Sequence, residues 1–359
     1  MTAAEPAGPV GPVVIVGAGL VGASIGLALR TSGEQVHLVD RSMSHAVVAA
    51  GLGAGVVERA DPAEVRLVVA ATPPDVIPRV VLESLRRYPH AVVTDVGSVK
   101  GRILAELRAS GTDLSRYVGS HPMAGSQQAG PLTAVAELFV DRTWAVTAAP
   151  ENRPEDVARV RRMAELCGAH VVAMAADDHD EAVAQVSHLP QLMSTLTAGH
   201  LRQVPGEHLQ LAGQGIRDVT RIAASDPVLW RQIISANAAA IRRELEGVRH
   251  DLDELFAVLD DPEALERFMD RGRSGARLLP GKHGAHPADW VAVVIEIPDT
   301  PGALGRLFHD IGAEGVNVED LSIEHDAKRE VGHLSVEVSP PVAERLRQAM
   351  RAKGWALRA

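Results

Sequence analysis

The feature that most constrains the fold is a glycine turn in the segment VVIVGAGLVGASIGLALRTSGEQVHLVD, which begins at Val13. A β-branched run precedes Gly17, Gly19 and Gly22, an apolar-periodic helix follows, and a second strand ends at Asp40. In such a βαβ unit the first glycine permits a tight turn, the second lets a pyrophosphate approach the backbone, and the third lets helix pack on strand. The segment therefore predicts a dinucleotide site.

Asp40 indicates which dinucleotide to expect. A carboxylate at the end of the second strand can accept both ribose hydroxyls of NAD and would repel the 2′-phosphate of NADP. Arg41 follows it and could neutralise that repulsion, so NADP remains an alternative. We expect NAD as the cofactor, and a glycine turn that binds no nucleotide is the remaining structural interpretation.

Strand and helix signals alternate up to about residue 175, and the strands are solidly apolar. This pattern predicts a parallel sheet covered by helices on both faces. We expect an α/β Rossmann domain at residues 10–175, an all-α substrate and dimerisation domain at 176–275, and a Gly/Pro/Arg/His-rich linker at 276–288. The last part, residues 289–359, has a βαββαβ pattern typical of a small α+β module.

The helical domain is expected to begin at an N-cap formed by Asp177 or Asp178. Apolar residues follow at helical spacing: Val183, Val186, Leu189, Leu192, Met193 and Leu196. A second helix is predicted to start at Asp226 and Pro227 and to run on to Leu259 as a short heptad seam. We interpret that seam as the interface of a homodimer, with a bundle inside one chain as the alternative.

Composition excludes several classes of function. No apolar run reaches the roughly 18 residues of a membrane helix, and the N-terminal MTAAEPAGPVGP lacks the features of an export signal. The single cysteine, Cys167, excludes an internal disulfide, which is typical of the cytoplasm. A net charge of -10 with 3% aromatic residues argues against nucleic-acid binding. We expect a soluble cytoplasmic protein with no nucleic-acid or membrane partner.

Several motifs in this order resemble the prephenate and arogenate dehydrogenase family: GAGLVGASIGLAL, TDVGSVK, GSHPMAGS, VSHLPQ and GIRDVTRIAASDPVLW. The later segments IPDTPGALGRLF and GVNVEDLSIEH resemble an ACT amino-acid-binding domain, which some family members carry. The resemblance covers roughly residues 13–355. It implies NAD-dependent oxidative decarboxylation, in which hydride leaves the ring carbon that bears the 4-hydroxyl and the ring carboxylate leaves as CO2.

The resemblance implies that His121 is the base that takes the hydroxyl proton. A neutral imidazole suits that task at physiological pH. Ser98 is then placed to hydrogen-bond the imidazole or the substrate hydroxyl. Taken alone, a histidine at a strand end is more often structural, and only the whole set of motifs favours catalysis.

On the substrate side, Arg221 matches the family's carboxylate-binding arginine, and a guanidinium can grip a carboxylate through two hydrogen bonds. An ion pair with Asp218 on the helix surface is the alternative. His188 matches another substrate-side position, or else it caps a helix break at Pro190. Trp230 matches a position near the active site, although a tryptophan in a helical domain is core by default.

The resemblance further places Ser126 and Gln127 on the substrate side and Thr72 at the cofactor. Some family members have an acidic residue where Gln127 stands, and an acid there would pair with the ammonium of arogenate. The neutral amide favours prephenate, which carries a keto group instead. Some members have His where Gln191 stands, so an anion contact from that position is left open here.

The ACT-like module implies a regulatory site. Pro301 and Gly302 precede a helix whose N-terminus can receive an amino-acid carboxylate, and Asn317 stands where the family's side-chain amide binds the ligand. We expect tyrosine as an inhibitory effector, with a purely structural, dimer-forming module as the alternative.

No metal site is predicted. The acidic run DDHDE, residues 177–181, is interpreted as a solvated helix start, because consecutive helical residues point in different directions and acidic groups suit the positive end of the dipole. The function we predict is an NAD-dependent prephenate dehydrogenase of tyrosine biosynthesis. Arogenate dehydrogenase and a non-catalytic sensor of amino acids or NAD are the alternatives.

Overall fold

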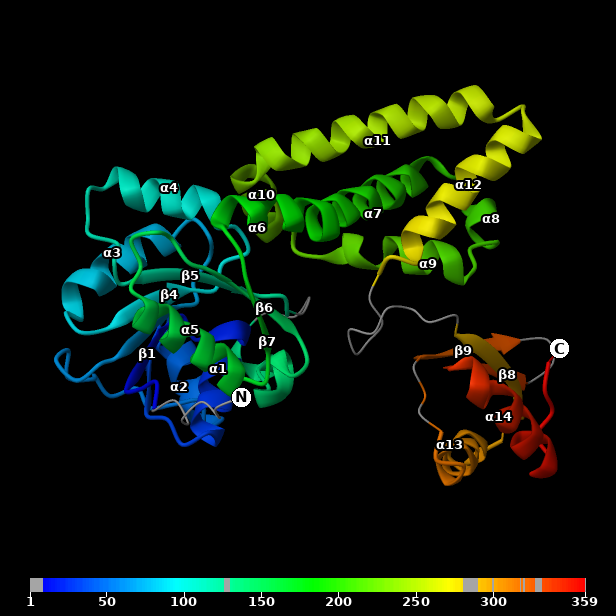
Figure 1. The fold of residues 1–359 in the computed structure, drawn as a ribbon, viewed down its shortest axis with the longest axis horizontal. Coiled ribbons are helices and arrows are strands. Elements are labelled where there is room, and N and C mark those ends of the chain that lie inside the picture. The colour runs from blue at the N-terminus through cyan, green and yellow to red at the C-terminus, as the bar shows by residue number, and fades with distance from the viewer. Residues whose placement is uncertain are drawn as a thin grey trace. The chain divides into compact units, whose positions relative to one another are not determined.

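The computed structural model describes residues 9–125, 130–279, 290–298, 300–316, 318, 320–326 and 331–358. The chain forms two compact units, Met1–Asp251 and Leu252–Ala359, and each is described by itself. Figure 1 follows the chain from the sheet of the first unit, through a helical segment, to the small sheet of the second.

The first unit is built on a sheet whose described strands have the order β2-β1-β3-β4-β5-β6-β7. The first five strands in the chain pair in parallel, with Val13 of β1 opposite both Val36 of β2 and Leu67 of β3. The strands are β1 (Val13–Val16), β2 (Val36–Val39), β3 (Leu67–Ala70), β4 (Val92–Asp95), β5 (Tyr117–Pro122), β6 (Thr143–Thr147) and β7 (His170–Ala173).

The far edge of the sheet departs from the predicted parallel arrangement. Strand β6 runs antiparallel to β5, with His121 opposite Ala145, and β7 is parallel to β6. A parallel neighbour needs a long crossover, usually a helix. The described chain between β5 and β6 forms two short 3-10 turns, η1 (Pro131–Thr133) and η2 (Ala136–Phe139), so it returns as an antiparallel strand.

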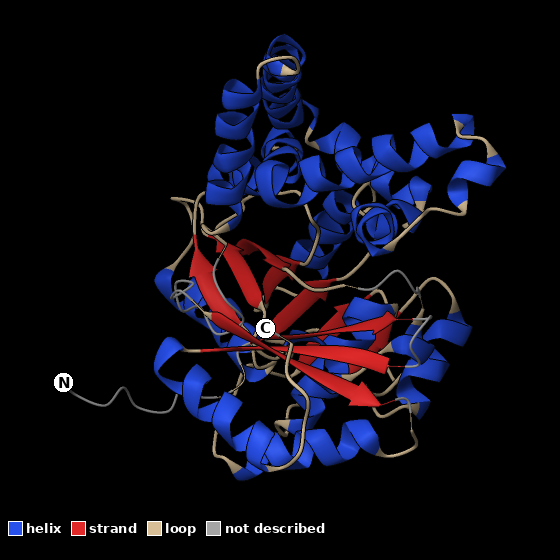
Figure 2. Ribbon diagram, turned by 90° about the vertical axis from the view of Figure 1, so that its right-hand side faces the viewer, coloured by secondary structure: helices blue, strands red, loops and turns tan. Residues whose placement is uncertain are grey.

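Helices cover both faces of this sheet, and Figure 2 draws the helices in blue and the strands of both units in red. Successive side chains of a strand point to opposite faces. In β1, Val13 and Ile15 belong to one hydrophobic core and Val14 to the other, so both faces are buried. The covering helices are α1 (Leu20–Thr31), α2 (Met43–Gly51), α3 (Ile77–Arg87), α4 (Gly101–Ala109) and α5 (Pro154–Leu166).

The segment after β7 is helical throughout its described part of the first unit. Its elements are α6 (Ala176–Val183), the π-helical turn η3 (Ala184–His188), α7 (Leu189–His200), η4 (Leu201–Gln203), α8 (Gly206–Leu209), α9 (Gln214–Thr220), η5 (Arg221–Ala224), α10 (Pro227–Ala236) and α11 (Ala238–Val258). The predicted start of α10 is confirmed, because the Asp226 carboxylate accepts a hydrogen bond from Val228 N at 2.8 Å. The predicted N-cap at Asp177 or Asp178 is wrong, since both lie inside the first turn of α6.

The predicted long helix is interrupted at Asn237. Helix α10 ends at Ala236, α11 begins at Ala238, and the Asn237 side chain donates a hydrogen bond to Asp180 O at 2.7 Å. A side-chain amide that bonds backbone elsewhere offers the chain an alternative to a continuous helix. The break therefore joins α10 to α6.

The apolar stripe predicted for α6 and α7 is buried only in part, since Val183 is 3% exposed and Leu192 packs against a small core. Val186 and Leu196 are each 64% exposed. The buried positions of this helix are largely polar: His179, Asp180, His188, Gln191 and Ser194. A buried polar face needs polar partners, because an unpaired buried polar group is destabilising.

The second unit contains α12 (Pro262–Ala276), β8 (Val291–Pro298), α13 (Ala303–Ala313), β9 (Asp320–Asp326), β10 (Val331–Val338) and α14 (Pro340–Ala352). Its sheet has the order β8-β10-β9, with antiparallel pairing. The predicted last strand is reduced to one bridge between Leu357 and Ile295. Leu307, Leu334 and Leu346 pack with Ile295 in one core. Most of the predicted linker, residues 280–288, lies outside the described residues.

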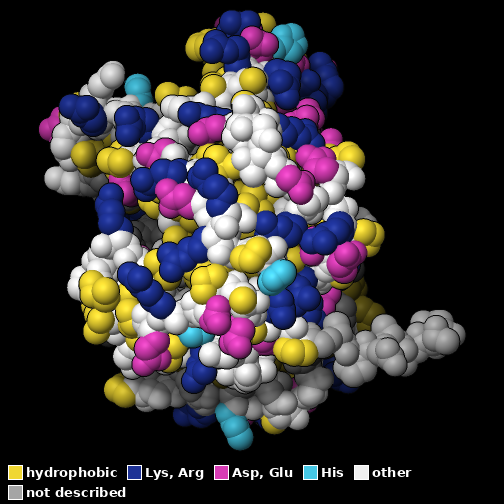
Figure 3. Space-filling model, turned by 90° about the vertical axis from the view of Figure 1, so that its left-hand side faces the viewer, with side chains coloured by type: hydrophobic (Ala, Val, Ile, Leu, Met, Phe, Trp, Pro, Cys, Tyr) yellow, Lys and Arg dark blue, Asp and Glu magenta, His cyan; other side chains and the backbone are white. Residues whose placement is uncertain are grey.

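None of the described helices is long and apolar enough to cross a membrane. On the face of the molecule drawn in Figure 3, basic side chains are interspersed with acidic and apolar ones.

Candidate active site

The glycine turn between β1 and α1 leaves room for a ligand. A Cβ atom on Gly17, whose φ is +104°, would collide with the carbonyl of Ala71, and one on Gly22 would collide with the carbonyl of Gly17. A Cβ on Gly19 would meet nothing within 4 Å. The first and third glycines thus serve close packing, while Gly19 opens the backbone toward the start of α1, where a pyrophosphate would bind.

Asp40 and Thr72 flank this turn, because β1 lies between β2 and β3 in the sheet. Asp40 follows β2, and Thr72 follows β3. The Asp40 carboxylate accepts hydrogen bonds from Ala18 N and Ser42 N, each at 2.7 Å, which fixes it at the end of β2. Thr72 follows β3, and its buried Oγ1 has no hydrogen-bond partner among the described residues. An orphaned polar atom next to the turn calls for a polar ligand. These residues fit NAD.

His121 lies in β5, and the helical segment supplies its partner. Its Nδ1 lies 2.9 Å from Nε2 of His179, with the two rings edge to face at a centroid distance of 5.1 Å. Its Nε2 has no hydrogen-bond partner among the described residues. Burial holds the pKa of His121 well below its usual value, and His179, Lys100 and His188 lower the pKa further.

The interpretation of residues 177–181 as a solvated helix start holds for Asp177, Asp178 and Glu181, which are exposed, and is wrong for the two residues between them. His179 is 1% exposed and Asp180 is 8% exposed. The Asp180 carboxylate accepts hydrogen bonds from Lys100 N at 2.7 Å and Gly101 N at 2.8 Å, so it caps α4 from another domain. One signal was present in the sequence: spacings of eight and three residues place Asp180, His188 and Gln191 on one helix face.

A second buried group lies beside His121, and we call Asp95, Lys100 and Tyr117 the ionic cluster. Lys100 forms an ion pair with Asp95 and donates to Ser120 O at 2.8 Å, while the Tyr117 hydroxyl donates to Asp95 at 2.8 Å. Burial lowers the pKa of Lys100, although Asp95 opposes that change. Burial and Asp95 raise the pKa of Tyr117 well above its usual value.

Ser98 lies in the turn between β4 and α4, two residues before Lys100, and is partly exposed. Among the described residues it forms no hydrogen bond with His121, whose Nδ1 bonds His179 instead. The described residues therefore show no hydrogen bond between Ser98 and the imidazole, and the expected contact with the substrate hydroxyl stays a prediction.

His188 completes what we call the histidine cluster, which consists of His121, His179 and His188. His188 is 1% exposed, and its Nδ1 lies 3.2 Å from the side-chain nitrogen of Asn237. Its ring meets that of Trp230 edge to face at 6.1 Å. Burial lowers the pKa of His188 to about 4, with Asp180 raising it and His179 lowering it further. His188 ends a π-helical turn within a continuous helix, so it does not cap a break.

Arg221 is exposed at the start of η5. Helix α7 holds the next residues in place, because Gln191 donates to Ile222 O at 3.0 Å and Ala223 N donates to Ser194 Oγ at 3.1 Å. The buried Gln191 amide thus supports the turn that carries Arg221. Three other predicted site residues, Ser126, Gln127 and Asn317, lie outside the described residues.

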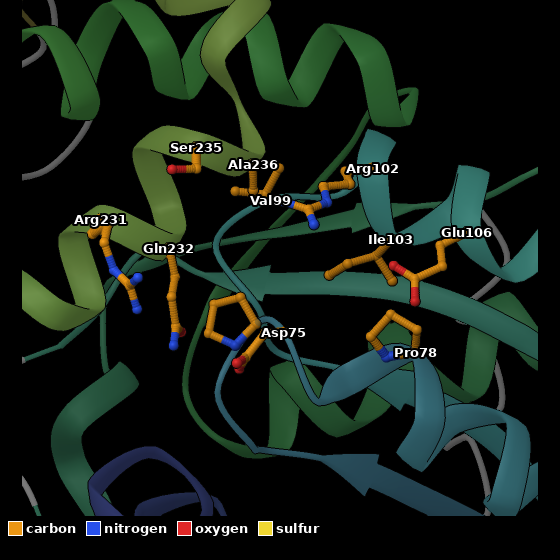
Figure 4. Close-up of a pocket in the computed structure, with 11 residues that line it drawn as sticks. Asp75, Pro78, Val99, Arg102, Ile103, Glu106, Arg231, Gln232, Ser235 and Ala236 are labelled. Carbon is orange, nitrogen blue, oxygen red and sulfur yellow. The ribbon is translucent and has the colours of Figure 1, made fainter.

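Figure 4 shows a pocket of about 350 Å³ where α10 faces α4 and the loop after β3. Arg231 and Gln232 extend into it from α10, and Asp75 lies on the loop opposite. The Gln232 Oε1 atom is buried with no hydrogen-bond partner in the described part of the chain. The pocket includes Val99, the neighbour of Ser98, and none of the predicted site residues lines it.

The fold joins a dinucleotide-binding sheet to a helical segment that supplies two of the three residues of a buried histidine cluster. This arrangement defines a nicotinamide-dependent dehydrogenase of two domains. Residues 25–173 match the nucleotide-binding domain of prephenate dehydrogenase, and residues 175–271 match the dimerization domain of prephenate dehydrogenase. The chain belongs to the prephenate dehydrogenase family and is an NAD-binding oxidoreductase.

Individual relatives agree with this assignment. A probable prephenate dehydrogenase, NovF, from Streptomyces niveus is 33% identical and covers 95% of this chain and 98% of the relative. The structure of prephenate dehydrogenase from Aquifex aeolicus, in complex with hydroxyphenyl propionate and NAD+, is 27% identical with a TM-score of 0.66, over 74% of this chain and 96% of that one. Arogenate dehydrogenase from Synechocystis is 28% identical with a TM-score of 0.64, over 74% and 98% of the two chains.

Proposed function

We propose that this chain converts prephenate to 4-hydroxyphenylpyruvate in tyrosine biosynthesis, with His121 as the base. The observation that supports this role is the state of the imidazole. His121 is held by one hydrogen bond through Nδ1, its depressed pKa keeps it neutral at physiological pH, and its Nε2 has no partner among the described residues. A neutral, oriented imidazole is the group that this reaction needs.

The chemistry fixes what the base must do. Bound NAD+ supplies the hydride acceptor. His121 takes the proton of the 4-hydroxyl as the ring carbon gains carbonyl character, and the ring carboxylate then leaves as CO2. Because the product keeps a hydroxyl at that carbon, the proton must be returned to the oxygen. A histidine that both accepts and releases a proton near neutral pH meets this requirement.

The glycine turn and two other residues would hold the cofactor. Gly17, Gly19 and Gly22 would receive the pyrophosphate at the start of α1, and the fixed Asp40 carboxylate would accept the ribose hydroxyls. Thr72 would offer its orphaned hydroxyl to the same ligand.

Arg221 would bind a substrate carboxylate, with His188 and Trp230 on the same side and Ser98 reaching the substrate hydroxyl. The support for Arg221 is its placement, since α7 follows directly on His188 at the end of η3 and also holds the turn in which Arg221 lies. Replacing Arg221 with alanine should raise KM for prephenate about 10- to 100-fold, the loss expected for a hydrogen-bonded charge, and change kcat less. An unchanged KM contradicts this role.

Prephenate is proposed over arogenate because Gln127 is neutral and cannot pair with an ammonium group. Ser126 and Gln127 keep the substrate-side roles that the sequence suggests. Arogenate remains the second candidate, favoured by the likeness to the Synechocystis arogenate dehydrogenase.

We further propose a homodimer regulated by tyrosine. Exposed apolar side chains of the helical segment would be covered by a second copy of this chain. They are Val186, Leu196, Leu209, Leu211 and Val219. In the ACT-like module, Gly302 has a left-handed φ of 84° just before α13, and with Pro301 and Asn317 it would form the effector site.

Cys167 is a buried thiol whose pKa is raised to about 12, and a single unpaired thiol suits the cytoplasm.

The test is to mix the purified protein with NAD+ and either prephenate or arogenate and to follow NADH absorbance, with and without tyrosine. NADH from prephenate, lowered by tyrosine, is the expected result. NADH from arogenate alone refutes the interpretation of Gln127. No NADH from either substrate contradicts the proposed function, and unchanged rates with tyrosine refute the effector.

A further inference from the structure

One carboxylate, that of Asp180, connects the helical segment to helix α4 and to His179. Asp180 Oδ1 lies 2.9 Å from Nδ1 of His179, and the same carboxylate accepts the first backbone N–H groups of α4. His179 then reaches His121 through its other ring nitrogen at 2.9 Å. Asp180, His179 and His121 therefore form a single hydrogen-bonded series.

The donors and acceptors in this series can be assigned from chemistry. An ionised carboxylate only accepts, so the proton lies on Nδ1 of His179. A neutral His179 then has a lone pair on Nε2, and His121 donates its Nδ1 proton to it. The Nε2 atom of His121 is left unprotonated, which is the form that accepts a proton from a hydroxyl.

The surroundings hold the Asp180 carboxylate in one orientation. It receives three N–H donors, from Lys100 N, Gly101 N and His179 Nδ1. The first two form the N-terminus of α4, which stabilises negative charge. Hydrogen bonds to an ionised acceptor are short and strong, so the carboxylate has little freedom to rotate.

We propose that Asp180 and His179 are positioning residues that hold His121 in the tautomer with a bare Nε2. Since Asp180 also caps α4, the same carboxylate couples this tautomer to the docking of the helical segment on the sheet. The inference rests on the proposed role of His121 as the base and deepens it. When His121 takes a proton at Nε2, its Nδ1 proton stays on His121 and continues to be donated to Nε2 of His179, and Asp180 balances the new charge through that ring.

The charged and titratable groups that act on His121 are His179, Lys100 and His188. All three groups disfavour the protonated ring, and the hydrogen bond from His179 to Asp180 is the path by which a carboxylate compensates it. This separates the role of Asp180 from that of Asp95, whose oxygens bond Lys100, Tyr117 and Gly97 N.

The first test is Asp180→Asn in the full chain with NAD+ and prephenate. The new amide donates to His179 Nδ1, His179 then donates to His121, and the proton moves to Nε2 of His121. A tautomer error of this kind in the Ser-His-Asp triad lowers kcat about 10⁴-fold, so we expect a loss of about 10²- to 10⁴-fold with KM nearly unchanged. Asp178→Asn, at the exposed neighbouring position, is the matched control and should leave kcat unchanged.

Two variants of His179 separate hydrogen-bond polarity from packing. In His179→Gln the amide nitrogen can donate to Asp180 and the amide oxygen can accept from His121, so kcat should stay within about tenfold of wild type. His179→Leu removes the acceptor and should lower kcat at least about 10²-fold, the contribution of an effective general base. Equal kcat values for the two variants contradict the proposal, and this pair also serves where Asp180→Asn does not fold.

A spectroscopic measurement tests the tautomer directly. The imidazole 15N shifts of the NAD+-bound protein, with His121 assigned by its loss in His121→Gln, should report an unprotonated Nε2 in wild type and His179→Gln. They should report a protonated Nε2 in Asp180→Asn. A protonated Nε2 in wild type overturns the inference. This readout does not depend on turnover, so a protein that makes no NADH from prephenate or arogenate would refute the base and still test the series.

Discussion

Two buried polar clusters lie next to each other in the first unit, and they differ in charge and in how fully they are bonded. In the ionic cluster, Asp95 accepts hydrogen bonds from Tyr117, Gly97 N and Lys100, and Lys100 also bonds Ser120 O. In the histidine cluster, burial lowers the pKa of His121 and of His188, and Nε2 of His121 has no partner among the described residues.

The difference indicates a structural role for the ionic cluster and a chemical role for the histidine cluster. A buried charge is tolerated only when its partners are complete, and the ionic cluster is complete. A base must keep one atom unbonded, and Nε2 of His121 has no partner in the described part of the chain. The two clusters also interact, because the positive charge of Lys100 lowers the pKa of His121. The ionic cluster therefore helps to keep His121, the proposed base, neutral.

The largest expected effect is on the histidine cluster. His121→Asn removes the proton acceptor and should lower kcat for prephenate by about 10²- to 10⁴-fold, the usual contribution of general base catalysis. Binding of NAD+, measured by titration calorimetry, should be unchanged, since His121 is not part of the glycine turn. A kcat within a few-fold of wild type would show that the base lies elsewhere.

The next effect is on stability and concerns the ionic cluster. Lys100→Ala leaves the Asp95 carboxylate buried without its counter-ion and should reduce the free energy of unfolding by roughly 3–5 kcal/mol. Arg79→Ala is the control, because the Arg79–Glu83 pair is exposed, with side chains 73% and 62% accessible. Its loss should be below about 1 kcal/mol. Urea titrations of both variants decide the matter, and equal losses contradict the comparison.

A smaller loss is expected when only one hydrogen bond of the ionic cluster is removed. Tyr117→Phe deletes the hydroxyl that donates to Asp95 at 2.8 Å and keeps the ring. The free energy of unfolding should fall by about 1.5–3 kcal/mol, the range for hydrogen bonds to charged groups, while kcat stays within about twofold. A large loss of kcat with unchanged stability would place Tyr117 in the chemistry and remove the distinction.

The smallest effect is a pH dependence of stability. Burial lowers the pKa of His188 from 6.5 to about 4, so the unfolded chain binds the proton more readily than the folded one. The stability that His188 contributes is complete above pH 6.5 and is lost as the pH falls toward about 4. Urea midpoints measured across this range should fall in wild type and fall less steeply in His188→Gln. Parallel curves would contradict a neutral buried His188.

The parts that the sequence predicted correctly depend on neighbouring residues. The three glycines lie within six positions, and each has a conformational or packing reason to be there. The Asp226 cap is likewise decided within one helical turn. Residues this close in sequence leave a pattern that physical rules can interpret without the rest of the fold.

The parts that were missed depend on contacts between distant residues. His121 and His179 are separated by 58 positions, and no local periodicity reveals that they meet. Acidic residues at a helix start are ordinarily solvated, and Asp180 is buried only because the N-terminus of α4 docks on it. The same reason applies at Asn237, whose side chain bonds Asp180 O and so interrupts the predicted helix.

The measurement that tests the account most directly is the pH dependence of kcat for wild type with saturating prephenate and NAD+. The kcat profile reports the protonation of the base in the complex. Because burial, His179, Lys100 and His188 all lower the pKa of His121, kcat should stay constant through pH 6.5 and fall only at lower pH, as the imidazole takes up a proton. A fall in kcat that is centred at or above pH 6.5 would contradict a neutral, buried His121 as the base.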